Sequence, residues 1–265
     1  MPRSIALIGY GAIAKEIISA LEGSTDFTIS QVLVRPQRLG EVQYALGDGI
    51  SAITTCADIT DQTDFVLECA GHDAIRTYGP EILERGIDLG IVSIGALAEQ
   101  SLQDKLAAAC KSGNARLSII PGAIGGIDAL AAAGNQLENV SYTSRKPPTS
   151  WAGSPAEETH DLQAIKSETE IFKGTARTAA TDFPKNANVV ATVALAGIGF
   201  DRTTVSLMAD PKATGNTHQI AAKGQMFDFS YTTQGAALPS NPKTSALTAL
   251  SALRCIKARG SGLIV

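Results

Sequence analysis

Three histidines are the side chains of this sequence best suited to proton transfer near neutral pH, because the ordinary pKa of imidazole lies there. His218 follows a polar loop and leads into an expected strand, where Asn216 and Thr217 could orient its ring. His72 follows an expected strand in the first half of the chain, whereas His160 lies among acidic residues, as is typical of a solvated surface. The residues alone leave open His218, His72, or a reaction that uses neither as its acid or base.

A glycine-rich turn near the N-terminus is the most specific local pattern. An apolar run ends at Gly9, and the spacing to Gly11 and Ala14 fits G-x-G-x-x-G/A. Gly9 permits the tight turn, Gly11 lets the backbone approach a pyrophosphate, and Ala14 allows close packing of helix on strand. Ala12 and Ile13 open a helix whose unpaired N–H groups would bind the phosphates of NAD or NADP. The alternative is a tight turn in a domain without a cofactor.

The end of the expected second strand bears on the choice of cofactor. NAD enzymes usually carry an acidic residue there, which holds the ribose 2′-hydroxyl. This chain has Arg35, with Arg38 close behind. Because a guanidinium can pair with a 2′-phosphate, we expect NADP to be accepted, alongside or instead of NAD. The alternative is an exposed loop arginine.

Small residues at later strand ends leave room for the nicotinamide half of the cofactor. Ala70 and Ala96 follow two expected strands, at the sheet edge where such folds bind ligands. The turn-rich segment 121–126, which contains Ala123, follows the next strand. We therefore expect Ala70 and Ala96 to contact the cofactor, and segment 121–126 could do the same.

An anionic substrate would need cations, and four are candidates: Arg145, Lys146, Lys185 and Lys243. Lys243 precedes Thr244 and Ser245, whose hydroxyls could add donors at a helix N-terminus. We therefore expect these three residues to bind substrate, although a surface role is the alternative for each lysine. Asn186 or Asn188 could cap a helix or bind the carboxamide of nicotinamide.

The first 120 residues alternate strands with helices, which predicts a Rossmann-type doubly wound parallel sheet. This α/β domain has expected strands at 4–8, 27–34, 65–68, 89–94 and 116–120 and helices at 12–21, 73–85 and 99–112. From 121 to 240 several strands follow one another, which favours a second, α+β domain with an open mixed sheet. A last helix is expected at 243–259, and we expect the segment 241–265 to pack back on the first domain.

Composition excludes several classes of protein. With 22 basic and 26 acidic residues the net charge is −4, so a nucleic-acid partner is not expected. Apolar runs are too short to cross a membrane, and the start shows no signal peptide. Four scattered cysteines have no metal-ligand spacing, so we expect free thiols, no metal and a cytoplasmic location.

Several segments together resemble the L-aspartate dehydrogenase family. The resemblance runs through most of the chain, and it is carried by the segments 9–13, 93–97, 122–128, 146–148, 174–177, 183–189, 209–211, 216–218 and 241–245. The glycine turn is shared by many enzymes. The combination Asn186 to Val189, Asn216 to His218 and Asn241 to Ser245 is far more specific.

The resemblance implies a reaction. A member of this family would oxidise L-aspartate with NAD or NADP to iminoaspartate and then oxaloacetate and ammonia, in some organisms feeding NAD biosynthesis. The catalytic histidine would be His218, Ala123 and Asn188 would contact the cofactor, and the protein would be a homodimer. Two other functions stay open: a reductase of another small imine or aldehyde, similar to dihydrodipicolinate reductase, and a dinucleotide sensor without catalysis.

Overall fold

The computed structural model describes residues 2–238 and 241–260, which fall into two compact units. Unit 1 contains the chain up to Gly122 together with the segment that starts at Thr248, and unit 2 is Ala123–Leu247. Among the described residues, no helix is both long enough and apolar enough to span a bilayer.

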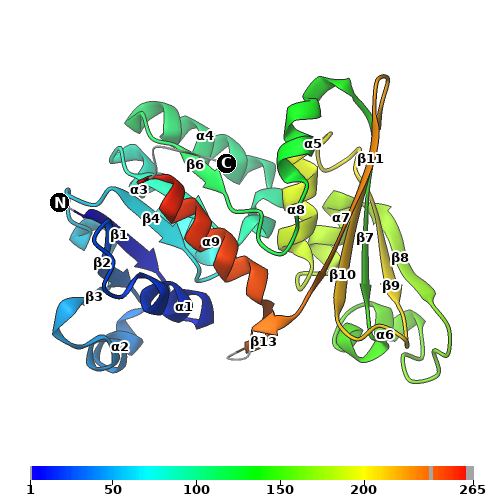
Figure 1. Cartoon of the computed structure of the whole chain (residues 1–265), viewed down its shortest axis with the longest axis horizontal. Helices are drawn as coiled ribbons and strands as arrows, with labels where there is room; N and C mark the ends of the chain where they lie inside the picture. Colours follow the sequence, from blue (N-terminus) through cyan, green and yellow to red (C-terminus); the bar gives the residue numbers. More distant parts are fainter. Residues whose placement is uncertain (1, 239–240, 261–265) are drawn as a thin grey trace. The chain divides into compact units, whose positions relative to one another are not determined.

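Unit 1 is built on a six-stranded sheet with the order β3-β2-β1-β4-β5-β6 (Figure 1). All neighbours pair in parallel, which confirms the doubly wound sheet. The strands are β1 (Arg3–Ile8), β2 (Phe27–Leu33), β3 (Ser51–Ile53), β4 (Phe65–Glu68), β5 (Asp88–Ile91) and β6 (Leu117–Ile119). Strand β3 was not expected from the sequence.

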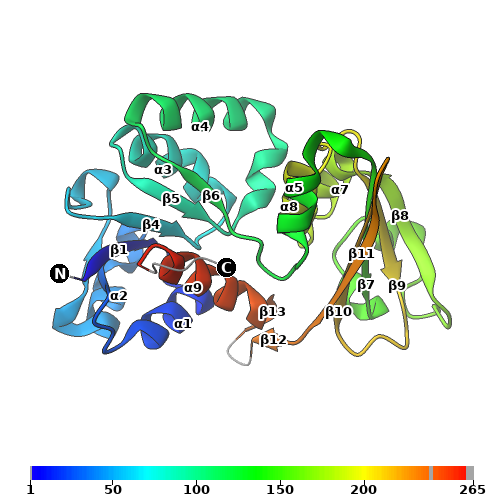
Figure 2. The same cartoon turned by 45° about the horizontal axis from the view of Figure 1, so that its top comes forward.

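Helices cover both faces of this sheet (Figures 1 and 2). Ile17 of α1, Val42 of α2 and Ile256 of α9 share one apolar core with the sheet residues Ile5 and Leu7. Helices α3 and α4 pack against each other on the opposite face. The helices of unit 1 are α1 (Ala12–Leu21), α2 (Leu39–Leu46), α3 (His72–Glu84), α4 (Gln100–Gly113) and α9 (Ala246–Ala258), the last of which begins in unit 2.

The C-terminal helix α9 begins later than expected. Asn241–Ser245 forms strand β13, which pairs antiparallel with β12 (Ala237–Leu238). The expected helix at 243–259 is therefore wrong at its start, because the backbone of these residues pairs with another strand. Beyond α9, the Arg259 guanidinium lies 3.8 Å from the ring centroid of Phe65 and pairs with Asp88 at 2.7 Å.

Unit 2 contains a five-stranded sheet with the order β11-β10-β7-β9-β8, in which only β7 and β9 are parallel neighbours. This confirms the mixed sheet of the second domain. The strands are β7 (Leu137–Lys146), β8 (Thr169–Thr175), β9 (Thr204–Ala209), β10 (Asn216–Gly224) and β11 (Asp228–Gly235), and the helices are α5 (Ile127–Ala133), α6 (Ala156–Thr159), α7 (Ala176–Asp182) and α8 (Ala187–Ala196).

Side chains of the long strand β7 point alternately to the two faces of the sheet, so buried and half-buried residues alternate along it. Tyr142, Ser144 and Lys146 are buried on the inner face. Thr143 and Arg145 are half-buried on the outer face. One end of the inner face is thus polar although it is closed to solvent.

The turn between β1 and α1 requires glycine at its first position. Gly9 has φ +93°, and a Cβ there would lie 2.8 Å from Cβ of Ala70. Gly23, after α1, has φ +72° but open space around the same position. Both glycines avoid backbone strain, and only Gly9 also avoids a steric clash.

Alanine at these two positions separates the two effects. We expect Gly23→Ala to lower the free energy of unfolding by about 1–2 kcal/mol through backbone strain alone. Gly9→Ala should cost about 1–3 kcal/mol more, because the clash with Ala70 is added to the strain. Urea denaturation measures both values, and equal losses would contradict the close packing of Gly9 on Ala70.

Candidate active site

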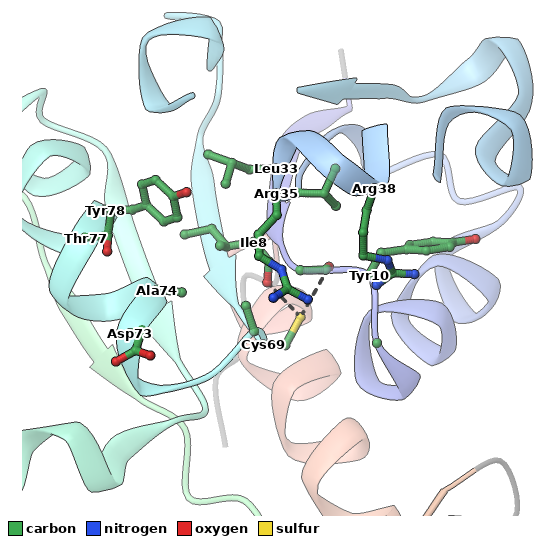
Figure 3. A pocket seen from close by; sticks show the side chains of 14 residues that line it. Ile8, Tyr10, Leu33, Arg35, Arg38, Cys69, Asp73, Ala74, Thr77 and Tyr78 are labelled. Atoms are coloured by element: carbon green, nitrogen blue, oxygen red, sulfur yellow. Dashed lines mark hydrogen bonds between the residues drawn. The ribbon is translucent and has the colours of Figure 1, made fainter. Parts of the chain in front are cut away.

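A cavity of about 460 Å³ lies at the carboxyl edge of the unit 1 sheet. Gly9 and Gly11 line it from the β1–α1 turn, and Ala70 from the loop after β4. Figure 3 shows the opposing walls: Arg38 and Tyr10 lie on one side, and the α3 residues Asp73, Thr77 and Tyr78 on the other.

The beginning of α1 provides this cavity with hydrogen-bond donors. Gly11 occupies the N-cap position, and no side chain caps the helix. A Cβ on Gly11 would meet nothing within 4 Å, so the space beside the turn is open. Ala12 and Ile13 form the first turn of α1 but do not line the cavity. Uncapped N–H groups beside open space suit the pyrophosphate of a dinucleotide.

Two arginines bring positive charge to the cavity. Arg35 and Arg38 both line it just after β2. Arg38 is held by Glu41 at 2.8 Å, and this hydrogen bond raises the pKa of Arg38. Among the described residues Arg35 forms no ion pair, so its charge is available to a ligand.

Glu68, at the end of β4, is an organising residue that sequence analysis missed. Its carboxylate is fully buried and accepts hydrogen bonds from the N–H groups of Ala70 and Gly71, both at 2.7 Å. It also accepts from Ser93 through the hydroxyl at 2.9 Å and the N–H at 3.1 Å. One carboxylate therefore joins the loops that follow β4 and β5. An acidic residue in an otherwise apolar strand was the available signal.

The other small residues predicted to contact the cofactor lie in different surroundings. Ala96 is buried in a short 3-10 helix (Ile94–Ala98) and does not line the cavity. Ala123 is buried at the start of unit 2. Within unit 2, the ring of Tyr231 packs closely against the loop that follows Ala123. A Cβ on Gly125 would lie only 2.6 Å from that ring.

A buried polar cluster occupies the inner face of the unit 2 sheet. His218 of β10 pairs in register with Ser144 of β7, and both are buried. The Nδ1 atom of His218 lies 2.7 Å from the hydroxyl of Tyr142. Lys146 donates to Oδ1 of Asn186, and its ammonium lies 5.0 Å from the ring centroid of Trp151. We refer to His218, Tyr142, Ser144, Lys146 and Asn186 as the inner-face cluster.

Burial sets the charges in the inner-face cluster. It lowers the pKa of His218 to about 4, with the charge of Lys146 as the second cause. Burial, followed by the charge of Lys185, lowers the pKa of Lys146 to about 8, and burial raises the pKa of Tyr142. At neutral pH His218 is therefore neutral, while Lys146 is mostly charged. Because Tyr142 occupies Nδ1, Nε2 of His218 is the atom left to exchange a proton.

The other two histidines lie elsewhere. His72 is the first residue of α3, close to the carboxyl edge of the unit 1 sheet. His160 is exposed, and its Nδ1 lies 2.8 Å from the hydroxyl of Thr159. Neither belongs to the inner-face cluster.

The two asparagines differ from what their positions suggest. Asn186 occupies the N-cap position of α8, yet its side chain makes no cap hydrogen bond, so the cap interpretation is wrong for this residue. Its oxygen binds Lys146 instead. Asn188 lies half-buried in the first turn of α8.

Of the four candidate cations, Lys146 alone is buried in the described part of the chain. Arg145, on the outer face, pairs with Glu168 at 2.6 Å, and Lys185 donates to the carbonyl of Ala152 at 2.7 Å. The side chains of Lys243 and Thr244 lie outside the described residues.

The third residue of that predicted substrate site is Ser245, which is half-buried and has a hydroxyl without a hydrogen-bond partner. It ends β13 and directly precedes Ala246, the first residue of α9, so Ser245 lies at a helix N-terminus although the helix begins later than expected. Within the described ranges, no three His, Cys, Asp or Glu side chains gather as metal ligands would.

Comparisons with known proteins agree with both units. Residues 9–119 match the NAD binding domain of homoserine dehydrogenase, and residues 128–259 match the C-terminal domain of aspartate dehydrogenase. The L-aspartate dehydrogenase of Cupriavidus taiwanensis is 42% identical over 98% of this chain and 99% of its own. That of Ruegeria pomeroyi is 44% identical over 98% of this chain and 93% of its own.

A solved structure supports the fold. The crystal structure of aspartate dehydrogenase from Thermotoga maritima matches with a TM-score of 0.82 over 100% of both chains, at 24% identity. The glycine turn, the inner-face cluster and relatives more than 40% identical over nearly the whole chain lead to one conclusion. The chain belongs to the L-aspartate dehydrogenase family.

Proposed function

We propose that this NAD(P)-dependent amino-acid dehydrogenase oxidises L-aspartate, and that His218 is its acid–base residue. The observation that carries the proposal is a buried, neutral imidazole in the unit that matches the aspartate dehydrogenase C-terminal domain. The products are iminoaspartate and, after hydrolysis, oxaloacetate and ammonia. A supply of iminoaspartate to NAD biosynthesis stays a prediction.

The bound NAD or NADP supplies a hydride acceptor. Gly9, Gly11 and the first turn of α1, with Ala12 and Ile13, would hold its pyrophosphate. Ala70 lines the same cavity, and the Glu68 carboxylate fixes the loop that carries it. Contacts of the nicotinamide half with Ala96, Ala123 and Asn188 belong to the same proposal.

The chemistry assigned to His218 follows from its charge. Neutral Nε2 takes a proton from the substrate ammonium, so that the nitrogen lone pair can form the C=N bond as hydride leaves Cα. After that proton is released, the same nitrogen takes a proton from the water that adds to the iminium carbon. Tyr142 orients the ring for both steps through Nδ1.

Removal of His218 tests this role. We expect His218→Ala to lower kcat by about 100- to 10,000-fold, because proton transfer by a positioned base is lost. The affinity for NADH, measured by fluorescence titration, should be unchanged. His160→Ala, at an exposed site, is the control and should retain full activity. A near-native rate in His218→Ala would reject the assignment.

We propose that Arg35 allows the enzyme to use NADP. Its guanidinium lines the cavity just after β2, where the adenosine ribose of a dinucleotide lies in doubly wound folds. Arg38 is engaged by Glu41, so Arg35 is the better partner for a 2′-phosphate.

The ratio of specificity constants, kcat/KM for NADP over that for NAD, tests Arg35. A charge-assisted hydrogen bond contributes about 1.5–3 kcal/mol, so Arg35→Ala should lower this ratio by about 10- to 100-fold. The specificity constant kcat/KM for NAD itself should hardly change. An unchanged ratio would remove Arg35 from cofactor selection.

A homodimer through the outer face of the unit 2 sheet is also proposed. Thr143, Gln219 and Ala221 are only half-buried there. A hollow of about 520 Å³ on this sheet is lined by Ser141, Ala221 and Ser230, among others. Small and polar side chains on a broad strand surface suit a self-complementary contact.

The four free cysteines favour a cytoplasmic location, which cell fractionation would test.

Sedimentation equilibrium tests the dimer, which should have twice the chain mass of 27.5 kDa. Ala221→Arg places a bulky charge on the outer face and should yield monomers. Ser150→Arg, at an exposed position of the short 3-10 helix Pro148–Trp151 in the same unit, should leave the dimer intact. A monomeric wild-type protein at micromolar concentration would contradict the proposal.

A further inference from the structure

Lys146 is a buried cation without an anion. Its side chain is 8% exposed, and among the described residues no ion pair includes it. Its neighbours are the amide oxygen of Asn186, the ring of Trp151 and, at longer range, the charge of Lys185 and the neutral imidazole of His218. Burying a charge is costly unless an opposite charge accompanies it. The folded unit thus keeps a positive charge where the described part of the chain provides no negative one.

Asn186 adds an independent observation. Because an ammonium can only donate, the amide must turn its oxygen toward Lys146 and its NH₂ group away. That NH₂ group is buried and has no acceptor in the described structure. A buried donor without a partner loses its hydrogen bonds to water and gains none in return, so an acceptor is expected to reach it.

We infer that Lys146 and Asn186 form the binding site for one carboxylate group of the substrate. The inference rests on the proposed function, since it takes L-aspartate as the substrate. A carboxylate offers two acceptor oxygens, one for the Lys146 ammonium and one for the Asn186 NH₂ group. Lys146 is thereby a substrate-binding residue, and Asn186 both orients it and contributes a donor.

Occupation of this site would also prepare His218. The charge of Lys146 is one of the two causes that lower the pKa of His218. A carboxylate beside Lys146 offsets that charge, so the imidazole holds a proton more readily once substrate is bound. The groups that face this pair are Lys185 and Tyr142. Substrate binding and base strength are therefore coupled through one lysine.

The test uses succinate, a dicarboxylate without an amine, and the full-length protein saturated with NADH. Lys146→Met removes the charge and keeps the length of the side chain. We expect the dissociation constant of succinate, measured by calorimetry, to rise by about 10- to 100-fold, as for loss of a charge-assisted hydrogen bond. The dissociation constant of NADH should not change.

Lys166→Met is the matched control, because Lys166 is exposed and lies outside the inner-face cluster and the groups that face it. It should bind succinate like the wild type. Equal succinate affinity in Lys146→Met and wild type, or equal losses in both variants, would overturn the inference. Asn186→Asp provides a second test, since it adds a negative charge beside Lys146 and should exclude succinate. Thermal melting verifies that each variant is folded.

Two further measurements separate binding from a purely structural role. In wild type, succinate should raise the pKa of His218 in an NMR titration, and this shift should vanish in Lys146→Met. Succinate affinity in wild type should fall as the pH rises through about 8, because Lys146 loses its charge there. In Lys146→Met this pH dependence should be absent. A pKa of His218 that does not respond to succinate would contradict the coupling.

Kinetics distinguish the two carboxylates of aspartate. If kcat/KM falls for L-aspartate but not for L-asparagine in Lys146→Met, the site holds the side-chain carboxylate. If both fall equally, it holds the α-carboxylate. If the protein binds succinate through Lys146 and yet fails to oxidise aspartate, that result refutes the proposed function and leaves the inference about Lys146 standing. An unchanged KM for aspartate in an active Lys146→Met variant would refute the inference alone.

Discussion

Lys146 and His218 are two basic groups in one buried cluster. Protonation of both is costly, because two like charges would then lie close together away from water. Lys146 keeps its charge at neutral pH, and its field, added to burial, keeps His218 neutral. An imidazole that is neutral across the physiological range can accept a proton from a substrate. In the proposed mechanism a substrate carboxylate beside Lys146 offsets this field, so that the imidazole holds a proton more readily once substrate is bound.

The scaffold places these groups through a simple geometric rule. Alternate residues of β7 face the same way, so Tyr142 and Lys146 lie on either side of Ser144, which pairs with His218 across the sheet. Unit 1 also relies on one buried polar group: the carboxylate of Glu68 fixes two loops at the carboxyl edge of the sheet. In both units a few buried hydrogen bonds hold polar groups in defined positions.

Sequence reasoning succeeded where the pattern is local. The glycine turn, the parallel sheet and the mixed sheet could be predicted because strand and helix periods are visible in short windows. It failed for α2, β3 and α5, which are short, and for the start of α9. The sequence near Ser245 fits both a strand and a helix start, and pairing with β12 decides between them.

The amino-acid sequence by itself determined the two kinds of domain, the glycine turn and the family resemblance that pointed to His218. It left Lys146 as one of four candidate cations, because charge alone does not reveal burial. The tertiary structure distinguished the candidate cations whose side chains it describes. Arg145 pairs with Glu168 on the outer face, while Lys146 is enclosed beside Asn186. The pKa values of these groups arise from such packing, which brings together residues that are far apart in the chain.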